Sequence, residues 1–166
     1  MIILVDKKDR EIGKGEKIQV HKQGKLHRAF SIFVFNSKKE LLLQKRAKGK
    51  YHSAGLWANT CCSHPRSGED IEKAVHRRLK KEMGFDCTLK KAFSFIYKVK
   101  FSNNLLEHEY DHVFLGSFDG NPKPNKEEVE EWKWIGLEDL RRDMKKNPDN
   151  YAYWFKVSIK KVIEHR

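Results

Sequence analysis

A single amphipathic helix pattern, set among strand-like runs, most constrains what this chain can fold into. Apolar side chains recur at spacing four between Glu69 and Met83: Ile71, Val75 and Leu79. This spacing gives a helix one apolar stripe, which has to be buried against another apolar surface. Gly84 is placed to end the helix, and Ser67 is placed to cap its start.

Most of the remaining apolar residues fall in short runs typical of β-strands. We expect strands at Met1–Asp6, Ala29–Phe35, Glu40–Lys45, Leu56–Cys62, Phe93–Phe101, His108–Phe118 and Val129–Ile135. The polar turn at 36–39 predicts that the second and third runs form a hairpin. Two further helical patterns follow, at Leu137–Lys145 and Tyr151–Ile163. The expected fold class is α+β, an α/β/α sandwich with a mixed β-sheet, as one domain over residues 1–166.

Composition limits the classes of partner. The formal net charge of +12 favours an anionic partner, but the basic residues are spread from Lys7 to Arg166 rather than gathered in a stripe. A small phosphorylated substrate is therefore expected ahead of nucleic acid. No apolar run approaches 18 residues, so we expect no membrane span. Three cysteines, two of them adjacent, make a poor disulfide framework. We expect a cytoplasmic protein that is a monomer or a weak homodimer.

The run Asn59–Pro65, Asn-Thr-Cys-Cys-Ser-His-Pro, holds a thiol and an imidazole two residues apart. In an extended segment Cys62 and His64 project from the same face, because side-chain direction repeats every second residue. Cys61 then faces the other way and is expected to pack in the core. Such a pair at the end of a strand indicates an active site, although Cys-x-His pairs also occur in ordinary cores.

Five residues have the chemistry of one metal site: His21, His27, His64, Glu107 and Glu109. The two glutamates are two apart and share a face of an extended segment, so His108 between them points away. Nitrogen and oxygen ligands suit Mn²⁺, Mg²⁺ or Zn²⁺. A single histidine is more often a surface or core residue than a ligand, and we read four others that way: His52, His76, His112 and His165.

Charged side chains elsewhere suit a diphosphate and its cation. Arg78 and Glu82 share a face of the first helix, where they form either a surface ion pair or a site in which Glu82 holds Mg²⁺. Magnesium is commonly held by a carboxylate and substrate phosphates together. Four basic residues are candidates for binding phosphate. Three of them follow the second hairpin strand, Arg46, Lys48 and Lys50, and the fourth, Lys17, precedes His21.

The helix resembles the Nudix signature, Gly-x5-Glu-x7-Arg-Glu-U-x-Glu-Glu-x-Gly-U, where U is a bulky apolar residue. Glu69, Arg77, Leu79 and Glu82 match it, whereas Ser63, Arg78 and Lys81 replace a glycine and two glutamates. Nudix hydrolases assemble cations with those acidic residues, so two charge reversals argue against hydrolysis.

Joined to the thiol run, this altered box resembles the type I isopentenyl-diphosphate isomerases of the Nudix superfamily. The resemblance covers about Lys17 to Trp154, and its pieces occur in the family's order: His21, His27–Ser31, Gln44–Ala47, Leu56–Trp57, the thiol run, the box, Tyr97 and Glu107–Glu109. The tail around Trp154 lacks the family's usual Thr-Pro. The resemblance implies a metal-dependent enzyme that interconverts isopentenyl and dimethylallyl diphosphate.

The resemblance also implies a role for each matching residue. Cys62 and Glu109 are the groups that protonate and deprotonate the substrate on opposite faces, with the Tyr97 hydroxyl beside Glu109. Ligands of one divalent metal are His21, His27, His64, Glu107 and Glu109, and Glu82 holds the Mg²⁺ that binds diphosphate. The residues assigned to substrate contacts are Lys17, Arg46, Lys50 and Arg78. The indole that would stabilise a carbocation belongs to Trp154 or Trp57.

Two other functions remain open from the sequence. One is a Nudix hydrolase of nucleotide or prenyl diphosphates, which would release phosphate without needing Cys62. The other is a basic nucleic-acid-binding module with a structural zinc, which would bind RNA or DNA in a salt-sensitive way.

Overall fold

A nine-stranded sheet forms the centre of the computed structural model, which describes residues 1–50 and 52–166. The strands are β1 (Ile2–Val5), β2 (Glu11–Gly15), β3 (His27–Phe35), β4 (Leu41–Arg46), β5 (Trp57–Ala58), β6 (Cys61–Ser63), β7 (Leu89–Lys100), β8 (Leu106–Ser117) and β9 (Val129–Ile135). The helices are α1 (Lys17–Gln23), α2 (Ile71–Met83), α3 (Leu137–Lys146) and α4 (Tyr153–His165), with a short 3₁₀ turn at Pro148–Asn150.

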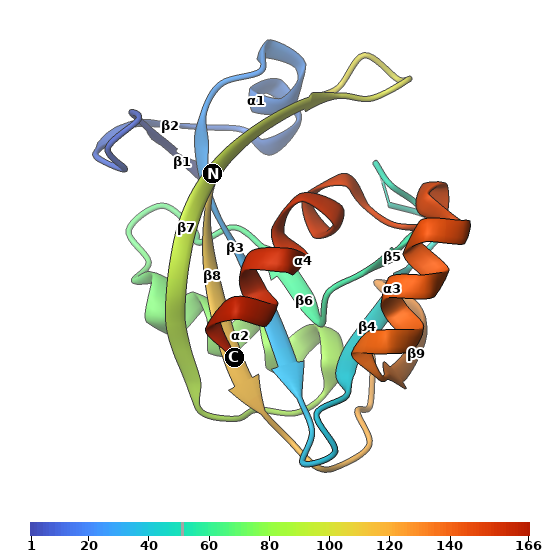
Figure 1. Cartoon of the computed structure of the whole chain (residues 1–166). Helices are drawn as coiled ribbons and strands as arrows, with labels where there is room; N and C mark the ends of the chain where they lie inside the picture. The colour runs from blue at the N-terminus through green and yellow to red at the C-terminus, as the bar shows by residue number, and fades with distance from the viewer. Residues whose placement is uncertain (51) are drawn as a thin grey trace.

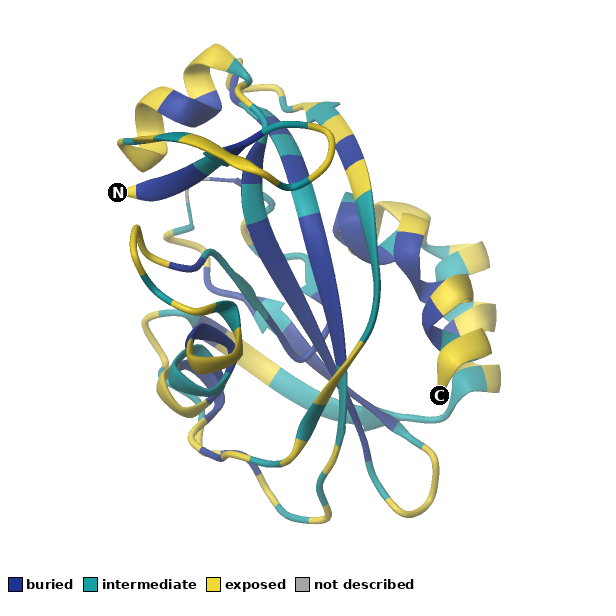
Figure 2. Cartoon of the chain, turned by 90° about the vertical axis from the view of Figure 1, so that its left-hand side faces the viewer, coloured by how far each residue is buried: buried dark blue, intermediate teal, exposed yellow. Residues whose placement is uncertain are grey.

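Helices cover both faces of this sheet (Figures 1 and 2). β3 and β8 run parallel to each other, whereas β7 and β8, β3 and β6, and β4 and β9 are antiparallel pairs. The predicted α/β/α sandwich with a mixed sheet in one domain is therefore confirmed.

β3 divides the core into two layers. Side chains alternate along a strand, so Phe30, Ile32 and Val34 pack in one layer with α2, while Phe33 and Phe35 pack in the other layer with α4. The apolar stripe of α2 lies in the first layer, as its spacing predicts. This division matters for the site because residues two apart on β3 or β8 face the same layer.

The predicted hairpin forms its turn, but its two strands separate at once. In the described residues β3 and β4 are paired at one register position, Phe35 opposite Leu41. The run Asn59–Cys61 occupies the opening between them. The Thr60 hydroxyl accepts a hydrogen bond from the Val34 amide at 3.0 Å and donates one to the Leu42 carbonyl at 2.7 Å. The thiol run thus satisfies backbone groups that a continuous hairpin would have paired, and it is held between the two strands.

The helix that follows the thiol run, α2, begins later than predicted. The structure places the N-cap at Asp70, whose carboxylate accepts a hydrogen bond from the Glu72 amide at 2.7 Å, so the prediction of Ser67 is wrong. Gly68 (φ 80°) lies in a turn that separates Ser67 from the helix. Gly84 ends the helix as predicted, with φ 71°, and a Cβ there would lie 2.1 Å from the Lys123 carbonyl oxygen.

Other boundaries also differ from the sequence expectation. β2 and α1 are not predicted, and the expected strand at 56–62 is divided into β5 and β6. The expected last helix starts at Tyr153, because Tyr151 instead forms an isolated bridge with Trp57 and its hydroxyl contacts Asp143. Short elements such as α1 are decided by packing more than by local sequence.

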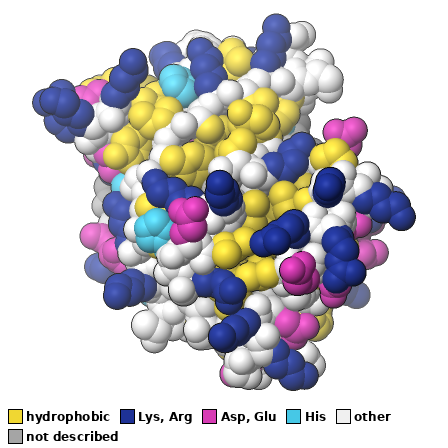
Figure 3. Space-filling view, in the orientation of Figure 1, with side chains coloured by type: hydrophobic (Ala, Val, Ile, Leu, Met, Phe, Trp, Pro, Cys, Tyr) yellow, Lys and Arg dark blue, Asp and Glu magenta, His cyan; other side chains and the backbone are white. Residues whose placement is uncertain are grey.

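Lysine and arginine side chains are distributed over the face shown in Figure 3, between patches of apolar side chains, without merging into one band. Across the described part of the chain, no helix is both long and apolar enough to cross a membrane.

Candidate active site

Most of the residues singled out from the sequence line one cavity of about 140 Å³. Those at its wall are Lys17, Arg46, Lys50, Cys62, His64, Arg78, Tyr97, Glu107, Glu109 and Trp154. The thiol of Cys62 and the carboxylate of Glu109 therefore open into the same space. These two residues lie on strands far apart in the sequence, β6 and β8, and the sheet brings them together.

Strand register aligns three of these residues in one row. His27 on β3 lies opposite Glu109 on β8, and Glu109 lies opposite Tyr97 on β7. Because paired residues share a face, all three side chains meet on the same side of the sheet. The Tyr97 hydroxyl donates to Glu109 Oε1 at 2.6 Å, and His27 Nε2 lies 3.3 Å from Glu109 Oε2.

Two histidines are oriented by backbone carbonyls. His21 Nδ1 lies 2.6 Å from the Lys17 carbonyl and His27 Nδ1 lies 2.9 Å from the Lys25 carbonyl. A carbonyl oxygen accepts only, so each Nδ1 donates to it, and loss of the second ring proton would leave the Nε2 lone pair free to hold a metal. Metal-binding histidines in proteins are oriented by hydrogen bonds of this kind.

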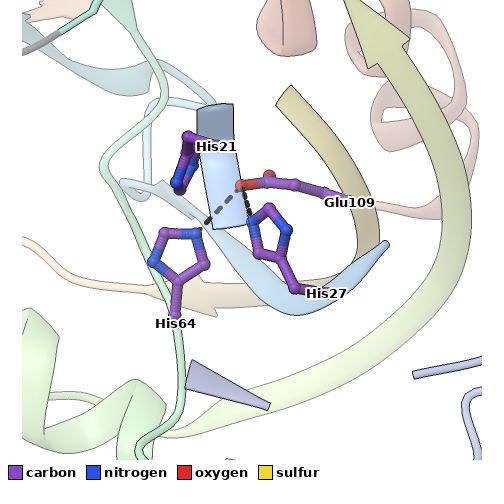
Figure 4. A group of neighbouring side chains, drawn as sticks. All are labelled: His21, His27, His64 and Glu109. Atoms are coloured by element: carbon purple, nitrogen blue, oxygen red, sulfur yellow. Dashed lines mark hydrogen bonds and ion pairs between the residues drawn. The ribbon is translucent and has the colours of Figure 1, made fainter. Parts of the chain in front are cut away.

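Four of the five predicted ligands form one compact group (Figure 4): His21, His27, His64 and Glu109. Their donor atoms all lie within 4.8 Å of one another. The fifth, Glu107, falls in an overlapping group with His21 and His52, in which Glu107 Oε1 lies 3.3 Å from His21 Nε2. His108 points away, as expected, with Nδ1 3.1 Å from the Gly24 carbonyl.

The electrostatics of this group favour a bound cation. Burial raises the pKa of Glu109, but hydrogen bonds from His27 and His64 outweigh it and hold the pKa well below the usual range. Burial lowers the pKa of His64 to about 4, so its ring is neutral at pH 7. Burial lowers the pKa of His27, but the hydrogen bond to Glu109 outweighs it and raises that pKa. A buried carboxylate beside three imidazoles is the donor set of a divalent metal, and these residues fit one.

The two adjacent cysteines face opposite layers. Cys62 lies opposite Ser31 in the β3–β6 pair and faces the cavity, whereas Cys61 is fully buried beside α2, with Sγ 2.6 Å from Glu82 Oε2. Burial raises the pKa of the Cys62 thiol to about 12. The positive charge of Arg46, whose Nη1 lies 3.7 Å from the sulfur, lowers this pKa but does not outweigh burial. The protein's own groups therefore keep the proton on this sulfur, and none of the three cysteines forms a disulfide.

Four cations line the same cavity and form what we call its cationic end: Lys17, Arg46, Lys50 and Arg78. They come from α1, from β4 and the segment that follows it, and from α2. Burial, and then the charges of Lys50 and Arg46, lower the pKa of Lys17. Positive charges gathered at such short range repel one another, which suits a site for a polyanion.

Two carboxylates accompany these cations, and the sequence drew attention to only one. Glu82 is 1% exposed and contacts a residue of the cavity wall, with Oε1 3.6 Å from Arg78 Nη2. Glu128 lies at the wall, with Oε1 2.6 Å from Arg78 Nη2 and 3.5 Å from Lys50 Nζ. No sequence signal separates Glu128 from its acidic neighbours, because its role depends on the fold of the segment before β9.

The two candidate indoles occupy different environments. Trp154 lines the cavity, donates from Nε1 to Asn59 Oδ1 at 2.9 Å, and has the Arg46 guanidinium 5.1 Å from its ring. Trp57 is not among the residues that line the cavity; it packs against the core cluster that contains Trp154 and Phe155, with Lys133 Nζ 4.3 Å from its ring. The position of Trp57 does not support the expected substrate contact.

His52 is the main residue of the site that the sequence did not predict. It lines the cavity and its Nε2 lies 2.8 Å from Glu107 Oε1. A lone histidine between a lysine-rich segment and a glycine gives no local signal of this position.

Comparison with known proteins identifies the fold of this chain. A model of the NUDIX domain matches residues 25–155. The DR0079 protein of Deinococcus radiodurans has a similar structure, with a TM-score of 0.74 and 17% identity over 96% of this chain and 97% of that one. A MutT NUDIX hydrolase from Burkholderia pseudomallei gives a TM-score of 0.65 at 20% identity, over 81% and 96% of the two chains. This chain has the Nudix fold.

Curated relatives of similar sequence identify the family within the Nudix fold. Isopentenyl-diphosphate Delta-isomerase 2 of Photorhabdus laumondii is 58% identical over 96% of this chain and 90% of its own length. The Aromatoleum aromaticum protein of the same name is 53% identical over 99% and 87%, and the Pectobacterium atrosepticum isomerase is 41% identical over 99% and 92%. The chain belongs to the isopentenyl-diphosphate Delta-isomerase family. The family predicted from the sequence is confirmed.

Proposed function

We propose that this protein interconverts isopentenyl and dimethylallyl diphosphate, with Cys62 and the Glu109–Tyr97 pair exchanging protons with opposite faces of the substrate. One observation carries the proposal: a single cavity is lined by a thiol, a carboxylate, a cluster of cations and residues of a metal-type donor group. Moving a double bond needs one proton donor and one acceptor, and the cations suit the diphosphate.

The reaction adds a proton to C4 of isopentenyl diphosphate and removes one from C2. The proposal assigns one transfer to the Cys62 thiol and the other to Glu109. Both atoms and charge balance, because the substrate returns one proton for the one it receives. General acid–base catalysis of this kind contributes about 10²–10⁴-fold to a rate.

Glu109 is suited to two tasks because its oxygens face different partners. Oε2 faces His27 and His64, at 3.3 and 3.0 Å, and Oε1 accepts from the Tyr97 hydroxyl at 2.6 Å. Under the proposal Oε2 belongs to the metal group, and Oε1 with Tyr97 carries the proton to or from the substrate. Burial raises the pKa of Tyr97, so its hydroxyl stays protonated and keeps donating.

The metal would be held by His21, His27, His64, Glu107 and Glu109, with Mn²⁺, Mg²⁺ and Zn²⁺ as candidates. When bound, it would supply a fixed positive charge that orients these ligands and holds Glu109 in place beside the substrate. Glu82 is proposed to hold Mg²⁺ at the diphosphate end, and Lys17, Arg46, Lys50 and Arg78 to contact the phosphate oxygens.

Protonation of the alkene places positive charge on C3, which water would capture. Trp154 is 3% exposed and presents an indole that attracts a cation by roughly 0.5–2 kcal/mol without attacking it. The buried wall around it supports the exclusion of water that this step needs.

The test is incubation with isopentenyl diphosphate and a divalent metal in deuterated water. We expect deuterium in the recovered dimethylallyl diphosphate and no released phosphate. Phosphate release from a panel of diphosphates, unchanged in a Cys62→Ala variant, would instead support a Nudix hydrolase and overturn the proposal.

A further inference from the structure

His52 is a loop residue whose side chain is turned into the protein. It lies between β4 and β5, in a segment where Lys48, Gly49 and Ala54 are exposed, yet His52 is only 7% exposed. The segment closes on itself through hydrogen bonds from the Gly55 amide to the Arg46 carbonyl, at 2.9 Å, and from the Arg46 amide to the Leu56 carbonyl, at 2.8 Å. This closure directs His52 toward the cavity.

The inward ring contacts Glu107. His52 Nε2 lies 2.8 Å from Glu107 Oε1, and both side chains are almost fully buried, at 4% and 2% exposed. An ionised carboxylate can only accept hydrogen bonds, so the ring N–H donates. A buried bond between a ring N–H and a carboxylate is short and strong, and it fixes the carboxylate plane.

The two oxygens of Glu107 have different surroundings. Oε1 has His52 at 2.8 Å and His21 Nε2 at 3.3 Å. Oε2 is buried and, among the described residues, has no hydrogen-bond partner. Burying such an oxygen without a partner is costly, so its position indicates a ligand that it would contact. The donor group of His21, His27, His64 and Glu109 is the neighbouring candidate for holding that ligand.

The imidazole is held in place by aromatic and backbone contacts. It stacks on Phe101 with ring centroids 5.0 Å apart and planes 4° apart, and it meets the Trp154 ring edge to face at 5.7 Å and 89°. Arg46 Nη2 lies 3.4 Å from the His52 carbonyl. One residue therefore contacts the metal-type donors, the indole and the cationic end.

We propose that His52 is a positioning residue for the metal centre: its Nε2–H holds Glu107 Oε1, which leaves Oε2 to ligate the divalent metal. His52 itself is not a ligand. The inference rests on the metal centre of the proposed function but does not require that isopentenyl diphosphate be the substrate. Hydrogen-bonded groups behind a metal ligand commonly contribute about 10–100-fold to metal affinity.

The experiment uses the full chain freed of metal and measures Mn²⁺ affinity by competition with a chromophoric chelator. His52→Phe keeps a flat ring on Phe101 but removes the N–H, and His52→Gln keeps an N–H donor. We expect His52→Phe to weaken Mn²⁺ binding by about 10–100-fold and His52→Gln to restore most of it. His76→Gln, at an exposed ion pair with Asp86, is the matched control and should bind like the unaltered protein.

The outcomes separate the possible roles. Unchanged Mn²⁺ affinity in His52→Phe would mean that the ring serves packing only, and equal losses in His52→Phe and His52→Gln would mean that the ring is itself a ligand. Either result overturns the proposal. If His52→Phe does not fold, His52→Ala is read in the same way.

A second readout is steady-state isomerisation at saturating metal. We expect a lower kcat in His52→Phe with a KM for isopentenyl diphosphate within about twofold, because Arg46 contacts the His52 backbone carbonyl, which the substitution keeps. If the unaltered protein does not isomerise this substrate, the proposed function fails, whereas the Mn²⁺ titration still decides the role of His52.

Discussion

The histidine–carboxylate end and the cationic end of the cavity are built from different kinds of side chain. The histidine–carboxylate end is built largely from short side chains in strand register, such as His27, Glu109 and Tyr97 across β3, β8 and β7. The cationic end uses long side chains from four segments, and Glu128 contacts two of them, Arg78 and Lys50.

This difference follows from what each end is proposed to bind. A metal needs donor atoms fixed to within a few tenths of an ångström, which strands and carbonyl-bound imidazoles provide. A diphosphate needs positive charge that can adjust to its oxygens, which lysine and arginine provide through flexible stems. Cys62 lies on the short strand β6, which pairs with β3, and it lines the cavity together with residues of both ends.

The sharpest way to break this picture is to remove the thiol. Cys62→Ala should reduce kcat by about 10³-fold or more, because one of the two proton-transfer groups is lost. Isomerase assays with metal analysis and a melting curve check that fold and metal content are kept. Cys87→Ala, at a half-buried cysteine outside the cavity, is the control and should retain activity. Substantial turnover in Cys62→Ala would contradict the assignment.

At the histidine–carboxylate end, Glu109→Gln should abolish activity and also weaken binding of Mn²⁺ by at least about 10–100-fold. The amide lacks the charge that both His27 and His64 face. Competition titration measures the affinity. A variant that binds Mn²⁺ like the unaltered protein would remove Glu109 from the metal group.

At the cationic end the effect should fall on substrate binding rather than on metal. Lys50→Met should raise KM for isopentenyl diphosphate by about 10-fold or more, since one hydrogen bond to a charged group is worth roughly 1.5–3 kcal/mol. Steady-state kinetics and the Mn²⁺ titration are compared for the same variant. Lys48→Met is the control: this lysine is 85% exposed and outside the cavity. Equal effects of the two variants would refute a specific phosphate contact.

The smallest effect concerns a buried histidine outside the site. His112 contacts Asp9 at 2.8 Å, and burial lowers its pKa to about 4. The unfolded chain, with a histidine pKa near 6.5, takes up the proton first, so this contribution to stability is complete above pH 6.5 and is lost as the pH falls toward 4.

Urea unfolding of the metal-free protein at pH 7 and pH 5 measures this loss. His112→Gln should reduce the pH dependence of the unfolding free energy by about 1–2 kcal/mol over that interval, because the variant has no proton to take up there. An unchanged pH dependence would mean that the burial of His112 does not perturb its protonation.

Sequence by itself determined the family, the sandwich and most of the cavity wall. Motifs such as the thiol run and Glu107–Glu109 carry their chemistry in fixed local spacing, and period-two alternation decides which residues share a face. For the same reason the local pattern alone separates the core residue Cys61 from the cavity residue Cys62.

Tertiary structure decided what local spacing leaves open. His52 and Glu128 entered the site, and Trp57 was left outside it, through the closure of the segment between β4 and β5 and the packing of α4. The hairpin opened because Thr60 bonds to both of its strands, a long-range exchange of hydrogen bonds that no local pattern reports. Contacts between residues distant in sequence depend on the whole fold, and that is why only the tertiary structure could assign them.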